Sequence, residues 1–209
     1  MHKITVCEHP FIQHRLTILR DKSTPVHQFR LALKECGALM AYEMAKDHPT
    51  KTVRVQTPLE PANGLRIETP VVLIAILRAA LGMVEGMAEF YPDARIGHLG
   101  MYRDPRTLQP VFYYSKLPVD LNHHPIILAD PMLATGGSIV AALDELKKFD
   151  CLDSVKIATL IAAPEGIARV REKYPDVPIY TAAVDRQLNE KGYILPGLGD
   201  AGDRQYGTA

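Results

Sequence analysis

The sequence has 209 residues, of which 47% are hydrophobic and 23% are charged. This composition predicts one globular domain over residues 1–209 and argues against widespread disorder. Basic and acidic residues number 24 each, and this zero net charge disfavours a general nucleic-acid binder or membrane-surface binder, although a few local groups could still hold a small anion.

The N-terminal part predicts a long helix followed by a hairpin. Ser23 and Thr24 offer capping hydroxyls and Pro25 suits a first helical turn. Apolar residues then recur at spacings of three and four up to Met40, and Pro49 ends the helix at the latest. Residues 53–68 contain an Asn-Gly pair, which favours a β-hairpin.

From residue 71 onward, predicted strands and helices alternate. The strands are 71–76, 95–101, 125–129, 155–162 and 179–184, and the helices are 82–90, 138–149 and 165–174. Continuous apolar runs such as 71–76 are typical of strands buried on both faces. The pattern predicts an α/β fold with a mostly parallel central sheet flanked by helices, and ligands bind at the carboxyl ends of such strands.

Two stretches interrupt this alternation. Residues 102–120 contain three prolines around an aromatic run, and we interpret them as a protruding flexible arm. The tail from 186 to 209 contains five glycines, so we expect an irregular segment, here called the hood. The hood also contains Tyr193, Ile194 and Leu198, which argues against simple disorder.

The cysteines and the apolar runs indicate a cytoplasmic protein. Cys7, Cys36 and Cys151 are scattered and odd in number, so they predict neither a disulfide framework nor a zinc site. The longest apolar run is strand-sized, and the first residues lack the apolar region of a signal peptide. We therefore expect a reducing compartment and no membrane partner.

The segment 126–138 carries the most functional information. An apolar strand ends on Asp130, and a short loop then leads to Thr135-Gly136-Gly137-Ser138 at a helix start. The N–H groups of a helix N-terminus and glycine backbone suit a phosphate, and Asp130 could accept hydrogen bonds from sugar hydroxyls. Taken alone, the four-residue motif favours an ordinary strand, turn and capped helix without a ligand.

The whole segment resembles the phosphoribosyl-diphosphate signature of the type I phosphoribosyltransferases. The residues Asp-Pro-Met-Leu-Ala-Thr-Gly-Gly-Ser are similar to the motif of the uracil phosphoribosyltransferase branch. Pro131 stands where other branches have a second acidic residue. Residues 76–83, 101–103, 162–166 and 192–203 also resemble that branch, so the likeness extends over essentially the whole chain.

The resemblance implies transfer of a phosphoribosyl group from 5-phosphoribosyl-1-diphosphate (PRPP) to uracil, giving UMP and diphosphate with Mg²⁺ as cofactor. It implies catalytic roles for Arg78, Arg103 and Asp200. The implied PRPP-binding residues are Arg78, Arg103, Asp130, Pro131, Met132, Leu133, Ala134, Thr135, Gly136, Gly137, Ser138 and Asp200. The implied uracil-binding residues are Tyr193, Ile194, Gly199, Asp200 and Ala201. Asp200 is also the expected Mg²⁺ contact, through water.

The sequence is compatible with more than one function. The family's diphosphate loop usually has glycine where this chain has Ala80, which would be strained if the position required a positive φ. Ala80 is thus the one support for an inactive paralogue. The sequence is also compatible with an RNA-binding regulator that senses uracil or UMP, and with a transferase for another base. A homodimer or homotetramer is expected, and GTP is a candidate regulator.

Overall fold

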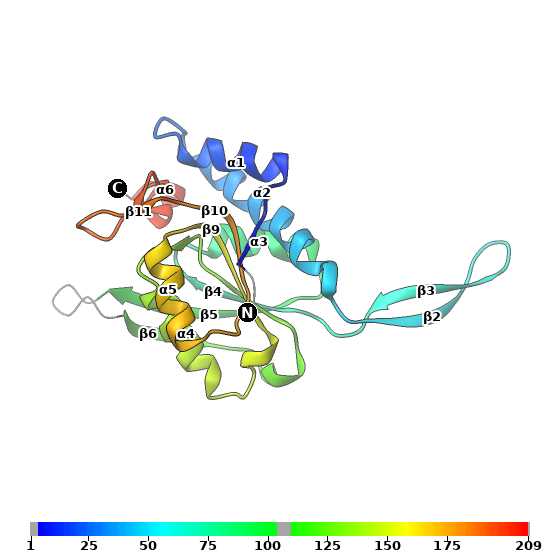
Figure 1. Ribbon diagram of the computed structural model, residues 1–209. Coiled ribbons are helices and arrows are strands. Elements are labelled where there is room, and N and C mark those ends of the chain that lie inside the picture. Colours follow the sequence, from blue (N-terminus) through cyan, green and yellow to red (C-terminus); the bar gives the residue numbers. More distant parts are fainter. Residues whose placement is uncertain (1–3, 104–109, 209) are drawn as a thin grey trace.

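The computed structural model describes residues 4–103 and 110–208, with only the backbone of Arg103. Its central sheet (Figure 1) has seven parallel strands, one of them short, and one antiparallel edge strand. The order across the sheet is β1 (Ile4–Val6), β10 (Ile179–Val184), β9 (Val155–Ala162), β7 (Ile126–Ala129), β4 (Val72–Leu77), β5 (Arg95–Arg103) and β6 (Pro110–Lys116). Within this sheet only β5 and β6 pair antiparallel, and the short β8 (Met132–Leu133) pairs parallel with β9. The predicted mostly parallel α/β sheet is therefore confirmed.

Helices cover both faces of this sheet. Along β4, Leu73 and Ala75 face one hydrophobic core, whereas Val72, Ile74 and Ile76 face the other. The first core is closed by α1 (Pro10–Arg20), α2 (Val26–Met44) and α3 (Leu81–Phe90). The second is closed by α4 (Gly137–Lys147) and α5 (Pro164–Lys173). Burial on both faces explains why the central strands are continuous apolar runs.

The N-terminal helices differ from the expectation in two ways. Helix α1, which begins at a proline, was not predicted. Helix α2 has Pro25 as its N-cap and no side-chain cap, because the Thr24 hydroxyl donates to the Ile18 carbonyl instead. Short 3₁₀ turns lie at Ala45–Asp47 (η1), Leu121–His123 (η2) and Leu152–Ser154 (η3).

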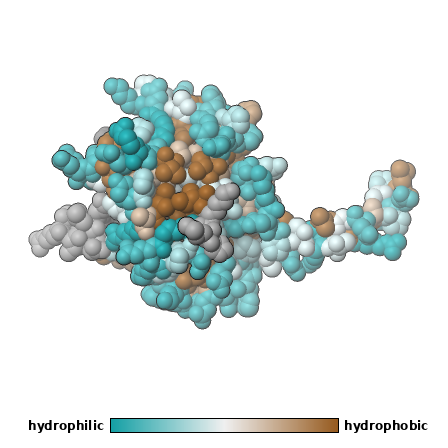
Figure 2. Space-filling model, in the orientation of Figure 1, coloured by the Kyte–Doolittle hydropathy of each residue, from teal (hydrophilic) through white to brown (hydrophobic). Residues whose placement is uncertain are grey.

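A long hairpin of β2 (Thr50–Gln56) and β3 (Pro61–Ile67) projects from the body (Figure 1), and Figure 2 shows it as a mostly hydrophilic arm. The predicted turn position was wrong. Asn63 and Gly64 lie within β3, opposite Arg54 and Val53. The turn lies at 57–60, because the Thr57 hydroxyl accepts hydrogen bonds from two backbone N–H groups there.

The arm and the hood contain more regular structure than expected. Residues 110–116 of the arm are the edge strand β6, while 104–109 lie outside the described residues. The hood contains β11 (Gln187–Leu188), β12 (Ile194–Leu195) and the short helix α6 (Ala201–Tyr206), so the prediction of no regular element was wrong. Across 4–103 and 110–208, no helix is both long and apolar enough to cross a membrane.

Candidate active site

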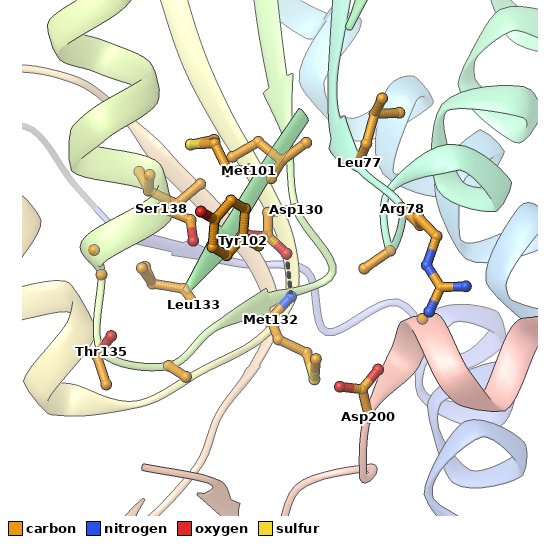
Figure 3. A pocket seen from close by; sticks show the side chains of 17 residues that line it. Leu77, Arg78, Met101, Tyr102, Asp130, Met132, Leu133, Thr135, Ser138 and Asp200 are labelled. Carbon is orange, nitrogen blue, oxygen red and sulfur yellow. Dashed lines mark hydrogen bonds between the residues drawn. The ribbon is translucent and has the colours of Figure 1, made fainter. Parts of the chain in front are cut away.

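A cavity of about 440 Å³ opens at the carboxyl ends of β4, β5 and β7 (Figure 3). Its lining comes from residues 76–79, Met101, Tyr102, Asp130, residues 132–139, Asp200 and Gly202. The cavity therefore brings together three segments that are far apart in the sequence: the phosphate-loop segment (residues 130–138), the Arg78 loop (residues 77–80) and the first part of α6.

The segment after β7 is fixed onto β9 by its backbone. The N–H of Asp130 donates to the Ala158 carbonyl at 3.1 Å, and the Pro131 carbonyl accepts from Leu160 and Ile161 at 3.0 and 3.1 Å. Gly136 is the N-cap of α4 with a φ of 77°, and a Cβ there would lie 2.8 Å from the Gly166 carbonyl oxygen. Glycine is therefore required for the chain to turn into α4, whose N-terminus faces the cavity.

Asp130 is a buried carboxyl group at the cavity wall. Its pKa is raised to about 7, mainly by burial and to a smaller extent by the negative charge of Asp200. Its Oδ1 accepts a hydrogen bond from the Met132 N–H at 3.2 Å, which opposes the shift. A perturbed carboxyl group in a cavity is a candidate for substrate contact.

The loop after β4 presents Arg78 at the cavity edge. Its side chain is 52% exposed, and its Nη2 lies 3.2 Å from Oδ1 of Asp203. Ala80 caps α3 with a φ of −79°, so the expected strain at this position does not occur. Arg103 is the last residue of β5, and its side chain lies outside the described part of the chain.

A second hollow of about 450 Å³ lies beside the first, between the hood and residues 132, 134 and 161 of the body. Both hollows share Met132, Ala134 and Asp200. Three further predicted uracil contacts, Tyr193, Ile194 and Gly199, line this second hollow. Ala201 is fully buried at the start of α6 and is not among the lining residues.

Asp200 stands between the two hollows. Its Oδ1 accepts a hydrogen bond from the Asp203 N–H at 2.9 Å, which caps α6. Figure 3 shows its carboxylate on the same side of the cavity as Arg78. Carboxylate oxygens are the ligands that Mg²⁺ prefers, so this side chain fits a contact to a magnesium ion, direct or through water.

A buried ion pair that the sequence interpretation missed fixes the hood. Arg20 of α1 donates to both Asp185 carboxylate oxygens, at 2.8 and 2.6 Å. The same pair holds both backbone groups of Gly197: Arg20 donates to its carbonyl at 2.9 Å, and its N–H donates to Asp185 at 2.9 Å. Asp185 follows β10 directly, and an acid at that strand end was the available signal.

Comparisons with known proteins agree closely with one another. A family model described as uracil phosphoribosyltransferase matches residues 6–208. Proteins of that name from Halalkalibacterium halodurans and Clostridioides difficile are 54% and 53% identical, each over 100% of both chains. A solved structure of an Aquifex aeolicus protein has a TM-score of 0.93 at 40% identity, covering 99% of each chain. A Bacillus anthracis hypoxanthine-guanine phosphoribosyltransferase, at 14% identity and a TM-score of 0.53 over 77% of this chain and 80% of its own, shares the fold alone.

Proposed function

The chain belongs to the uracil phosphoribosyltransferase family, and we propose that its two adjoining hollows hold the two substrates of that reaction. The enzyme transfers the phosphoribosyl group of PRPP to uracil, giving UMP and diphosphate. The observation that carries the assignment of the hollows is their shared wall at Asp200, because the two substrates must meet there.

The phosphoribosyl part of PRPP would occupy the first hollow. The N-terminus of α4 supplies N–H groups and a positive dipole end for the 5′-phosphate, and the hydroxyls of Thr135 and Ser138 lie in the same lining. Asp130 would accept hydrogen bonds from the ribose hydroxyls. Arg78 would bind the diphosphate, since a guanidinium stays charged and grips two oxygens at once. Arg103 remains predicted for the same role.

Uracil would occupy the second hollow. Its O2, N3–H and O4 edge presents acceptor, donor and acceptor, which backbone groups of an irregular segment can complement. The ion pair of Arg20 and Asp185 fixes Gly197, and Arg204 donates to the Leu198 carbonyl at 2.7 Å. The adjoining backbone at Gly199 is thereby held in one orientation. Cytosine would leave buried groups unpaired, which disfavours it strongly.

The reaction breaks the ribose C1–O bond, and charge develops on the leaving diphosphate. Arg78 would stabilise that charge in the transition state more than in the bound substrate, which is the condition for catalysis. Asp200 would hold Mg²⁺, and the ion would add to the neutralisation of the diphosphate charge. The walls of the hollows would exclude water that could otherwise hydrolyse the sugar.

A homodimer or homotetramer remains part of the proposal. The projecting β2–β3 hairpin exposes Leu59 and Leu65 at 93% and 70%, and large exposed apolar side chains on an extended arm favour a contact with another chain. The relatives described above are named for an enzyme, so an RNA-binding function has no support from them.

The direct test is UMP formation from radiolabelled uracil, PRPP and Mg²⁺, with cytosine, hypoxanthine and orotate in parallel reactions. Product from uracil alone is expected. Product from another base would contradict the proposed uracil contacts. The absence of product from folded protein that still binds UMP would contradict the catalytic function and favour the regulator or the inactive paralogue.

A further inference from the structure

Helix α6 contacts both the backbone and the side chain of the Arg78 loop. Gln205 is 1% exposed, and its Nε2 donates to the Ala79 carbonyl at 2.9 Å and to the Arg78 carbonyl at 3.4 Å. Oδ1 of Asp203 lies 3.2 Å from Nη2 of Arg78, and the Tyr206 ring centroid lies 5.6 Å from Cζ of Arg78. One short helix therefore contacts the loop at three different groups.

This helix is itself held firmly by the body of the protein. Arg30 of α2 donates to the Gln205 carbonyl at 3.0 Å through Nη2 and at 3.2 Å through Nε. Arg204 stacks over the Phe29 ring at 4.4 Å while it donates to the Leu198 carbonyl. Because α6 is anchored on α2, it can act as a rigid support for the loop that it contacts.

Arg78 needs such a support. Its long side chain is half-exposed and has many rotamers, so an unsupported guanidinium would lose considerable entropy on binding a diphosphate. The ion pair with Asp203 uses Nη2 and leaves the other N–H donors of the guanidinium for a ligand. Arg78 and Asp200 line the same hollow, so Arg78 borders the proposed diphosphate subsite.

We propose that Asp203 and Gln205 are positioning residues for Arg78: the carboxylate orients the guanidinium and the amide fixes the loop backbone. This inference rests on the proposed role of Arg78 in binding PRPP. It assigns a function to the part of α6 that lies beyond the residues expected to contact uracil.

The test compares kcat and the KM values for PRPP and uracil in Arg78→Ala, Asp203→Asn, their double variant, and Gln205→Met, which keeps the side-chain length but has no N–H donor. Asp47→Asn is the matched control, because it removes an ion pair to Lys156 near the start of β9, at the opposite end of the strands from the cavity. Asp203→Asn should raise the KM for PRPP about two- to fivefold, the range that a partly exposed charge pair produces. Gln205→Met should raise it as well, the KM for uracil should stay unchanged, and Asp203→Asn should have no further effect once Arg78 is alanine.

Each outcome decides between the proposals. If Arg78→Ala leaves the KM for PRPP unchanged, Arg78 does not bind the diphosphate, and both the proposed role and this inference fail. If Arg78→Ala raises that KM but Asp203→Asn lowers it or leaves it unchanged, the positioning inference alone is overturned. An effect of Asp203→Asn that persists in the Arg78→Ala background, or that falls equally on uracil, would show a general structural role and also overturn it.

Discussion

Replacing Asp130 by asparagine should make the protein more stable at high pH while it removes activity. Asparagine has the same shape and can still accept the hydrogen bond from the Met132 N–H, but it carries no charge. In the native protein, burial raises the pKa of Asp130 from 3.8 to about 7. The folded state therefore holds this proton more tightly than the unfolded state does.

The sign of the pH dependence follows from that difference. Between the two pKa values the folded protein binds more protons, so the stability that this group contributes is fully present below about 3.8 and is lost as the pH rises through about 7. At pH 5 the folded carboxyl group is mostly protonated, and at pH 8 it is mostly ionised. The free energy of unfolding should thus fall by about 2–3 kcal/mol from this group alone between pH 5 and pH 8.

Guanidinium unfolding of the native protein and of Asp130→Asn at both pH values measures this term. Other titrating groups affect both proteins alike, so the difference in unfolding free energy should shift by about 2–3 kcal/mol in favour of the variant as the pH rises. An unchanged difference, or a shift toward the native protein, would refute the argument that Asp130 is held in a destabilised, buried state. UMP formation by the variant should fall sharply, because a neutral amide cannot replace the carboxylate at the ribose.

Three further changes test the hood. Asp200→Asn should lower kcat about 10- to 100-fold while the melting temperature stays nearly constant, because asparagine caps a helix as well as aspartate does; an equal kcat would remove Asp200 from the mechanism. Gly197→Ala should destabilise the fold by at least about 1–2 kcal/mol in chemical denaturation, since its φ is 69° and a Cβ would meet a carbonyl oxygen at 2.2 Å. A Cβ added at Gly64 would have no atom within 4 Å, so Gly64→Ala should change the stability little. Equal losses of stability in Gly197→Ala and Gly64→Ala would contradict the steric argument. Arg20→Lys keeps the charge but loses the bidentate contact with Asp185. In steady-state assays the KM for uracil should therefore rise about tenfold while the KM for PRPP stays the same. Equal rises in both KM values would indicate a general loss of structure.

The central strands could be predicted from the sequence because burial on both faces selects apolar residues along each strand. A strand buried on both faces is apolar at nearly every position, and β4 and β7 have this pattern throughout, while β9 and β10 have it with few polar interruptions. Strand β6 was missed because it is a mostly exposed edge strand without an apolar face. Helix α1 was missed although a signal was available, since Ile12, Leu16 and Leu19 recur at spacings of four and three after a leading proline. The hairpin turn was misplaced because a Thr57 side-chain turn prevailed over the Asn63-Gly64 signal.

In the candidate site too, the local motif could be predicted from the sequence and the long-range contacts could not. The segment from Asp130 to Ser138 is contiguous, so its motif is visible in the sequence, and the structure places all of it except Pro131 in the lining of one cavity. The supports at Arg20 and Asp203 act across long sequence separations, and no local pattern marks them. Only the three-dimensional arrangement shows which charges meet.

The long separations within the Arg20–Asp185 and Arg78–Asp203 pairs, 165 and 125 residues, have a consequence for folding. Such contacts close very large loops, so we expect them to form late, after the sheet order β10-β9-β7-β4 has been established. A partly assembled chain would contain the phosphate-loop motif and yet have no competent site. After dilution from denaturant, UMP synthesis should therefore recover later than the helical circular-dichroism signal. Activity would then measure the completion of folding.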